Sequence, residues 1–490
     1  MKKQTPRDRK KPETKKTEPT KPRIPRPTVG QILDLSVTTL DEEGYGLALH
    51  ETTRVRVFGA LPGETVRARV TFAGLRDTFA DVVKVLRHAP GRLLTPPCGR
   101  GEECDGCPLI MMKYPAQLEW KRDLVEGAVR RYPSLREAEI LPVIPSPKPL
   151  GYRTTAKLVI AGRFASPIIG IYRRNSHDVM DIADCPLHHP LINRVVAAVR
   201  DGISRGKVPV YNPRTGGGIL RYLVVRVSER ENRAMVTFVT AERSFNEIHH
   251  LAKHLQGTVP EVAVVAQNVN ASAGNVILGD RDYFVTREQT LTDSIGDIRF
   301  SISPRSFFQV NSEGARAIYE TVREWSGLTG TETILDVYCG VGGISLYLAG
   351  KADQVMGIES VEAAVADAER NARLNGVRNA LFVAGDAAEL LGDLRDEGKV
   401  VDLVVLNPPR KGCDEQVLRS VAALGPGQVV YVSCSPRTLA RDLDILSGLG
   451  YQTRRIQPVD MFPQTPHVEN VALLAHQPLN VHKPVAPRTP

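Results

Sequence analysis

Residues 334–343 read ILDVYCGVGG, an apolar run that passes directly into a glycine-rich turn. The run predicts a buried strand, and the apolar residues from Ile344 onward predict a helix after the turn. Glycines at such a junction let the backbone approach a ligand closely. The spacing lacks the third glycine of the G-x-G-x-x-G dinucleotide fingerprint, so the turn indicates a different nucleotide cofactor.

Further strands are predicted downstream of this turn, with a helix-like segment between most neighbours. They lie at residues 354–358, 380–384, 402–406 and 428–432. Strands that alternate with helices are typical of a parallel sheet covered on both faces. Residues 304–478 are therefore predicted to form an α/β domain of the Rossmann-like class.

Acidic residues follow two of the predicted strands. Glu359 ends the second strand, where a carboxylate suits the hydroxyls of a ribose, and Asp386 ends the third, where it could meet an adenine edge. Ligands of such sheets bind at the carboxyl ends of the strands. Together with the glycine turn, these positions favour S-adenosylmethionine, which carries no phosphate.

Cys434 follows the fifth predicted strand, in the run VSCSP of residues 432–436. Its place at the carboxyl edge favours a nucleophile, although a buried strand cysteine is more often structural. The fourth strand leads into Asn407-Pro-Pro-Arg410. Methyltransferases that act on nucleobases often carry such a loop, and the alternative is a plain connection between strand and helix.

A cysteine beside a methyl donor suggests one reaction in particular. Carbon 5 of uracil becomes nucleophilic when a thiolate adds to carbon 6, and a base must later remove the proton on carbon 5. Glu469 follows a proline-stiffened segment and is the candidate base. His467 is the rival, since imidazole titrates near neutrality. The alternative for Glu469 is an ordinary solvated carboxylate.

Four of the seven cysteines predict a metal centre: Cys98, Cys104, Cys107 and Cys185. The odd total and the absence of a signal-peptide core argue against a disulfide framework. Zinc ribbons favour paired C-x2-C units, and this set contains one such pair. The uneven spacing favours an iron–sulfur cluster, with zinc as the alternative.

Charge is concentrated at the N-terminus. The net charge is +9, but residues 1–27 hold eleven basic and three acidic residues, and the rest holds 53 basic against 52 acidic. This proline-rich segment is predicted to be disordered, either binding RNA phosphates or only aiding solubility. No run of residues approaches a membrane span, and we expect a cytoplasmic protein without membrane contact.

The length of 490 residues predicts several domains. After the tail, residues 28–92 alternate apolar and basic residues between turns and predict a small β-barrel, with Arg54, Arg56, Arg67 and Arg69 pointing outward. Residues 93–303 are predicted to form a central α+β domain that carries the cysteines. Residues 479–490 are predicted to be loose.

In combination these residues resemble the RNA (uracil-5-)-methyltransferase family, and especially its iron–sulfur 23S ribosomal RNA branch. The likeness implies a TRAM domain at 28–92 and a [4Fe-4S] cluster on the four cysteines. It implies Cys434 as nucleophile and Glu469 as base. Residues 303–311, SPRSFFQVN, are similar to the family's segment entering the catalytic domain, which implies that Phe307 contacts the target base. The cofactor contacts implied are Gln309, Tyr338, Gly343, Glu359, Asp386 and Asn407. Asn407 replaces an aspartate common in the family, and Gly343 stands where an asparagine can occur.

We therefore expect a three-domain enzyme that methylates carbon 5 of a uridine in 23S ribosomal RNA, with the target base flipped out of its stack. The first alternative is the same chemistry on transfer RNA. An alternative of another class is a non-catalytic RNA-binding or chaperone protein. The sequence indicates no obligate protein partner.

Overall fold

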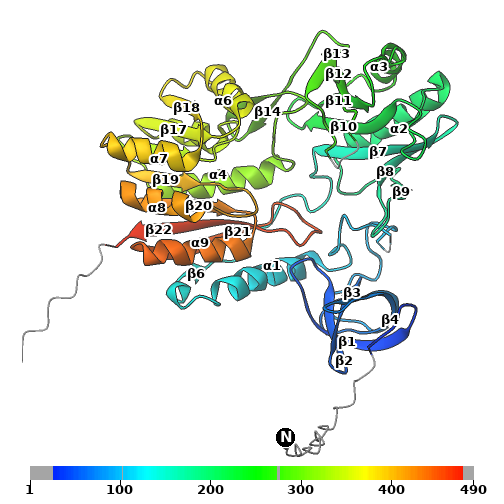
Figure 1. Ribbon diagram of the computed structural model, residues 1–490, viewed down its shortest axis with the longest axis horizontal. Coiled ribbons are helices and arrows are strands. Elements are labelled where there is room, and N and C mark those ends of the chain that lie inside the picture. Colours follow the sequence, from blue (N-terminus) through cyan, green and yellow to red (C-terminus); the bar gives the residue numbers. More distant parts are fainter. Residues whose placement is uncertain (1–25, 102, 273–275, 478–490) are drawn as a thin grey trace, which may run out of the picture. The chain divides into compact units, whose positions relative to one another are not determined.

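The computed structural model describes residues 26–101, 103–272 and 276–477 (Figure 1). Most of the predicted N-terminal tail and the predicted C-terminal tail lie outside these ranges. The described chain forms two compact units, one of residues 26–41 and 45–89, the other of 42–44 and 90–477. Within the described ranges, no helix combines the length and the apolar character needed to cross a membrane.

The first unit is the predicted barrel. Its five strands are β1 (Ile32–Leu40), β2 (Gly46–His50), β3 (Thr53–Phe58), β4 (Thr65–Ala73) and β5 (Thr78–Arg87), closed in the order β1-β2-β3-β5-β4. Alternate side chains such as Val55, Val57 and Val66 fill its core. The arginines between them point outward, as the alternation predicts, and Arg67 forms an ion pair with Asp34.

The second unit contains an eight-stranded sheet of order β18-β17-β16-β19-β20-β22-β21-β6. Five strands are parallel: β16 (Thr333–Val337), β17 (Gln354–Glu359), β18 (Ala380–Ala384), β19 (Leu403–Leu406) and β20 (Gln428–Ser433). The C-terminal strand β22 (Glu469–His476) runs antiparallel between β20 and β21 (Tyr451–Val459). The predicted parallel α/β core is therefore confirmed, with an antiparallel extension.

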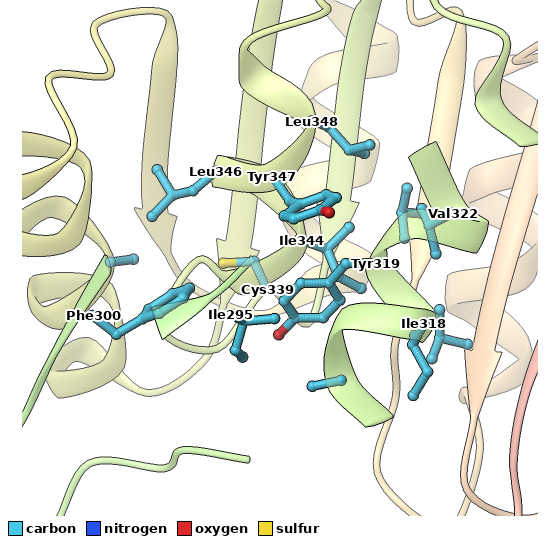
Figure 2. Packing of buried hydrophobic residues seen from close by; sticks show 14 of the residues in the cluster. Ile295, Phe300, Ile318, Tyr319, Val322, Cys339, Ile344, Leu346, Tyr347 and Leu348 are labelled. Atoms are coloured by element: carbon cyan, nitrogen blue, oxygen red, sulfur yellow. The ribbon is translucent and has the colours of Figure 1, made fainter. Parts of the chain in front are cut away.

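Apolar residues alternate between the two faces of this sheet. Ile334 packs in one core with α4 (Ser312–Ser326), α5 (Gly343–Ala349) and α6 (Glu362–Leu374). The neighbouring Leu335 packs in the other core with α1 (Tyr114–Val129), α7 (Ala387–Asp396), α8 (Glu415–Leu424) and α9 (Pro436–Gly448). Figure 2 shows the first core, where Tyr319 of α4 and Ile344 of α5 lie beside Cys339 of the glycine turn.

A second sheet of seven strands lies in residues 155–284, in the order β13-β12-β11-β10-β7-β8-β9. Its strands are β7 (Thr155–Arg163), β8 (Ser166–Tyr172), β9 (Val179–Asp181), β10 (Leu220–Ser228), β11 (Arg233–Thr240), β12 (Val262–Val269) and β13 (Arg281–Phe284). Helices α2 (Pro190–Gly206) and α3 (Ile248–Thr258) cover one face. This is the predicted central α+β domain.

The predicted boundaries of the central domain do not follow the packing. Helix α1 and strand β6 (Glu139–Ile140) belong to the α/β core, since β6 pairs with β21 and Val125 and Val129 are buried there. The hairpin of β14 (Leu291–Ile295) and β15 (Ile298–Ile302) also packs into that core. An amphipathic pattern shows that a segment has an apolar face, but not which neighbour covers it.

A buried ion pair ties α1 to the segment before β22. The Lys121 Nζ donates to Asp460 Oδ1 at 2.5 Å and to the Phe462 carbonyl at 3.0 Å. Both charged side chains are fully buried. Gln117, one turn earlier, exchanges hydrogen bonds with Gln464. Removing one partner of such a pair leaves an uncompensated buried charge, so this network fixes the path of residues 460–466.

Candidate active site

A pocket of about 1830 Å³ lies at the carboxyl edge of the parallel strands. It collects the predicted cofactor contacts, the predicted base contact and both predicted catalytic groups. These lining residues are Gln309, Tyr338, Gly343, Glu359, Asp386, Asn407, Phe307, Cys434 and Glu469. Because parallel strands end at one edge, residues up to 162 positions apart in sequence reach one cavity.

The glycine turn forms the floor of this pocket. Gly340 and Gly342 have φ angles of 57° and 80°, a left-handed conformation that favours glycine. Gly343 has a different reason to lack a side chain, since an added Cβ would lie 2.3 Å from the hydroxyl oxygen of Tyr319. The close approach of α4 to α5 therefore excludes the asparagine that the resemblance allows here, unless Tyr319 moves.

The two acidic residues after β17 and β18 are held in place by backbone amides. Glu359 accepts hydrogen bonds from Gly340 N at 3.1 Å and from Val361 N at 3.0 Å. Asp386 caps α7, accepting from Ala388 N at 2.8 Å. Both carboxylates line the pocket and keep lone pairs for a ligand. Their positions suit the ribose and base of a nucleoside.

Cys434 and Glu469 face one another across neighbouring strands. The register of β20 and β22 pairs Ser433 with Asn470. The next antiparallel step therefore sets Cys434 opposite Glu469, and opposite residues have Cβ atoms about 5 Å apart. The thiol and the carboxyl are thus neighbours at the wall of the pocket.

Burial shifts the pKa values of the two candidate bases in opposite directions, because it favours the neutral form of each group. It raises the pKa of Glu469 to about 7, although the charge of Arg410 opposes the rise. Partial burial, together with Arg410 and other cations, lowers the pKa of His467 to about 4, although the residue keeps solvent exposure. At neutral pH Glu469 can therefore both hold and release a proton, while His467 remains neutral.

Burial also raises the pKa of the Cys434 thiol, and the nearby Glu469 carboxylate raises it further. Arg410 acts against both effects through its charge and a hydrogen bond to the thiol. The resting site therefore favours a thiol. Its ionisation becomes easier when Glu469 is protonated, because two adjacent negative charges repel.

Arg410 is a candidate functional residue that the sequence did not single out by itself. Its Nη2 lies 3.4 Å from Nε2 of His467, and its guanidinium contacts Cys434 and influences Glu469. Within the described part of the chain it forms no ion pair with a carboxylate. The signal was present, since Arg410 ends the Asn-Pro-Pro-Arg loop, but only the fold places that loop beside β20 and β22.

Phe307 is 67% exposed, which is unusual for a large aromatic side chain in a pocket wall. It follows Arg305, whose Nε lies 2.9 Å from Asp282 Oδ2 on β13. That ion pair joins the segment entering the α/β domain to the central sheet. An exposed ring that lines the same pocket as Cys434 is suited to stack on a planar base.

The four predicted metal-ligand cysteines gather in the second unit. Burial, and then the charges of Cys185, Cys104 and Cys98, raise the pKa of Cys107, so all four thiols are neighbours. The Gly106 amide donates to the Cys104 sulfur at 3.3 Å. Over the residues that the structure describes, no three His, Cys, Asp or Glu side chains are grouped closely enough to hold a single metal ion.

Two family models match parts of this chain, and two of its curated relatives are named as RNA methyltransferases. Residues 221–477 match the family described as tRNA (Uracil-5-)-methyltransferase, and residues 26–83 match the TRAM domain. A protein of Geobacter sulfurreducens named as an uncharacterised RNA methyltransferase is 65% identical, over 91% of this chain and 90% of its own length. A similarly named protein of Halalkalibacterium halodurans is 37% identical, over 90% and 96%.

One solved structure is similar along nearly the whole chain. The tRNA (uracil-54, C5)-methyltransferase of Pyrococcus abyssi, in complex with S-adenosyl-L-homocysteine, is 30% identical and superposes with a TM-score of 0.74. The match covers 90% of this chain and all of the archaeal one. Its extent includes the barrel, the central domain and the α/β domain.

The raised pKa of Glu469 gives a pH-dependent stability. The carboxyl titrates near 4.5 when unfolded and near 7 when folded, so the folded protein binds the extra proton between these values. Native stability must then fall as pH rises through that window. We expect Glu469→Gln to raise the free energy of unfolding at pH 8, by at most about 3 kcal/mol, and hardly at pH 4.5.

Denaturant unfolding of both proteins at the two pH values measures this difference. The exposed Glu137→Gln is the matched control, and its effect should be equally small at both pH values. If Glu469→Gln changes the free energy of unfolding by the same amount at pH 4.5 and pH 8, the Glu469 carboxyl does not titrate near 7 in the folded protein.

Proposed function

The chain belongs to the tRNA (uracil-5-)-methyltransferase family, and we propose that it methylates carbon 5 of a uridine in 23S ribosomal RNA through a covalent adduct with Cys434. The observation that best supports this mechanism is the strand register that sets Cys434 opposite Glu469. A nucleophile and a base on adjacent strands can reach neighbouring atoms of one pyrimidine ring.

S-adenosylmethionine is the proposed methyl donor, as the S-adenosyl-L-homocysteine in the Pyrococcus abyssi structure suggests. When bound, it supplies an electrophilic methyl group. The residues proposed to hold it are Gln309, Tyr338, Gly343, Glu359, Asp386 and Asn407. The fit rests on the glycine turn and on the Glu359 carboxylate, which is fixed by amide donors at the rim of that turn.

Cys434 begins the proposed reaction. Its proton is released to solvent water, the sulfur forms a bond to carbon 6, and the ring electrons move to the carbonyl oxygen at carbon 4, so that carbon 5 becomes nucleophilic. After carbon 5 has gained the methyl group, Glu469 removes the proton from that carbon. The carbon 6–sulfur bond then breaks, which restores the ring double bond and releases the thiolate.

The electrostatics support Glu469 over His467 as the base. A general base works best when its pKa is near the working pH. Glu469 meets that condition at about 7, whereas His467 at about 4 is a much weaker base. Arg410 is proposed to stabilise whichever of Cys434 and Glu469 carries the negative charge at each stage.

The RNA class has two candidates. The four cysteines resemble the cluster ligands of the ribosomal RNA branch, which supports 23S ribosomal RNA as the substrate. The Pyrococcus abyssi relative acts on transfer RNA by its name, and its similarity over the full chain favours transfer RNA as the second candidate. In either RNA the uridine must leave its stack to reach Cys434, and Phe307 is proposed to support it.

Cys98, Cys104, Cys107 and Cys185 are proposed to bind a [4Fe-4S] cluster. The thiols are neighbours, and backbone amides of Leu187 and His188 donate to Cys185, as is common around cluster sulfurs. The cluster would tie residues 98–107 to the central domain.

RNA that contains 5-fluorouridine should trap the wild-type enzyme. The fluorine leaves no proton on carbon 5 for Glu469 to remove, so the Cys434 adduct cannot break down. We expect a denaturant-resistant protein–RNA complex on a gel, absent with Cys434→Ser. Glu469→Gln should accumulate a similar complex on ordinary RNA. Normal turnover by that variant would instead indicate His467 as the base.

Anaerobically purified protein should be brown and should absorb visible light. Replacing Cys107 by serine should remove most of that absorbance, because the cluster would lose one of its four ligands. Metal analysis should find iron and sulfide. Colourless protein that contains zinc would contradict the cluster.

Mass mapping of 5-methyluridine identifies the substrate. Ribosomal and transfer RNA from cells with and without the gene should differ at a 23S position. Loss confined to transfer RNA would support the second candidate, and unchanged modification in both would contradict each assignment.

A further inference from the structure

Two cations of the central sheet lie on the face that helices do not cover. The register of β7 and β10 pairs Thr155 with Arg226, so Lys157, two residues along β7, shares a face with Arg226. Such diagonal neighbours have Cβ atoms about 7 Å apart. The alternate residues Ala156 and Val225 pack against α2 and α3, which assigns Arg226 and Lys157 to the opposite face.

Arg226 is buried and poorly satisfied. It is only 7% exposed, and its Nη2 donates to the Pro304 carbonyl at 3.4 Å. Its Nε has no hydrogen-bond partner in the part of the chain that the structure describes. Burial alone lowers its pKa to about 10. Arginines in protein interiors are normally paired with carboxylates, so this guanidinium lacks its usual counter-charge.

Lys157 adds a second positive charge near Arg226. Partial burial, and then the charges of Arg226 and Arg153, lower the pKa of Lys157, although the residue keeps solvent exposure. Throughout the described ranges, neither Lys157 nor Arg226 forms an ion pair with an acidic side chain. Lys157 is exposed to solvent, whereas Arg226 is buried. Among the described residues, these two cations repel each other and form no ion pair with an acid, so an anion that binds between them would gain from their uncompensated charge.

The position of this pair identifies its ligand. Pro304, which accepts the hydrogen bond from Arg226, lines the active-site pocket and lies three residues before Phe307. We propose that Lys157 and Arg226 bind a phosphodiester group of the substrate RNA, next to the nucleotide that enters the pocket. This inference rests on the proposed function, because it concerns how the same RNA is held.

Arg153 is the neighbouring cation and has a different role. Its charge lowers the pKa of Cys107 and Cys185, after the larger effects that raise them, so it faces the cysteine thiols. Its Nε donates to the Thr155 carbonyl at 3.0 Å. Negative sulfur ligands can balance Arg153, which leaves Lys157 and Arg226 to bind the phosphate.

The test is equilibrium binding of unmodified 23S ribosomal RNA and transfer RNA transcripts as a function of salt. For each lost phosphate contact the slope of log K against log salt should fall by about 0.7 to 0.9. At 0.1 M salt this corresponds to roughly five- to eightfold weaker binding. We expect that change for Lys157→Gln and for Arg226→Met, with the KM for the methyl donor unchanged.

Stability separates a binding role from a structural one. Removing a buried, unpaired cation should leave the melting temperature of Arg226→Met equal to or above that of the wild type. Lys351→Gln is the control. It removes one exposed charge before β17, at the edge of the α/β sheet opposite to the pocket, and should change neither the RNA affinity nor its salt slope. If Arg226→Met melts below the wild type, the RNA affinity and salt slope of the exposed variant Lys157→Gln alone test the proposal.

Three outcomes overturn the proposal. Wild-type protein that methylates RNA while both variants keep its affinity and slope would exclude the phosphate contact but leave the proposed function intact. Wild-type protein that binds neither transcript would contradict the site and the substrate together. Inorganic phosphate that raises the melting temperature of the wild type but not of Arg226→Met, with an unchanged RNA slope, would indicate a site for a free anion.

Discussion

The active site depends on one constraint, the insertion of β22 antiparallel between β20 and β21. A parallel strand in that place would bring the start of β22 to the far edge of the sheet. The antiparallel direction brings Glu469, at the beginning of its strand, to the end of β20 where Cys434 lies. The buried Lys121–Asp460 pair supports this arrangement, because it fixes the segment that leads into β22.

The pocket combines groups whose charges oppose each other. Burial favours the neutral forms of Cys434, Glu469 and His467, and the Arg410 guanidinium counteracts this for the two acidic groups. One negative charge fits beside Arg410 more easily than two. Such an environment suits a reaction in which the charge moves from a thiolate to a carboxylate and back. Two prolines precede Arg410 and restrict the backbone of the loop that carries it.

The basic residues of the chain differ in what they can offer to RNA. On the barrel, Arg54 and Arg67 are already paired with Asp77 and Asp34, so much of their charge is locally balanced. In the central sheet, Lys157 and Arg226 form no ion pair with an acidic side chain of residues 26–101, 103–272 or 276–477. A charge that is left unbalanced in the free protein gains more when a phosphate arrives, since no existing ion pair has to break. Net charge alone, which is greatest in residues 1–27, would have directed attention elsewhere.

Local patterns in the sequence determined the strands, the glycine turn and the barrel, because alternation and turn residues act over a few positions. They also identified Cys434 and Glu469, but as separate residues with structural alternatives. Only the tertiary structure decided that these two lie opposite each other, that Arg410 joins them, and that α1 packs on the α/β sheet. The unpaired state of Arg226 was equally hidden, since a lack of partners depends on every segment that folds around a residue. Pairing, burial and charge balance arise from contacts distant in sequence, and no local pattern contains them.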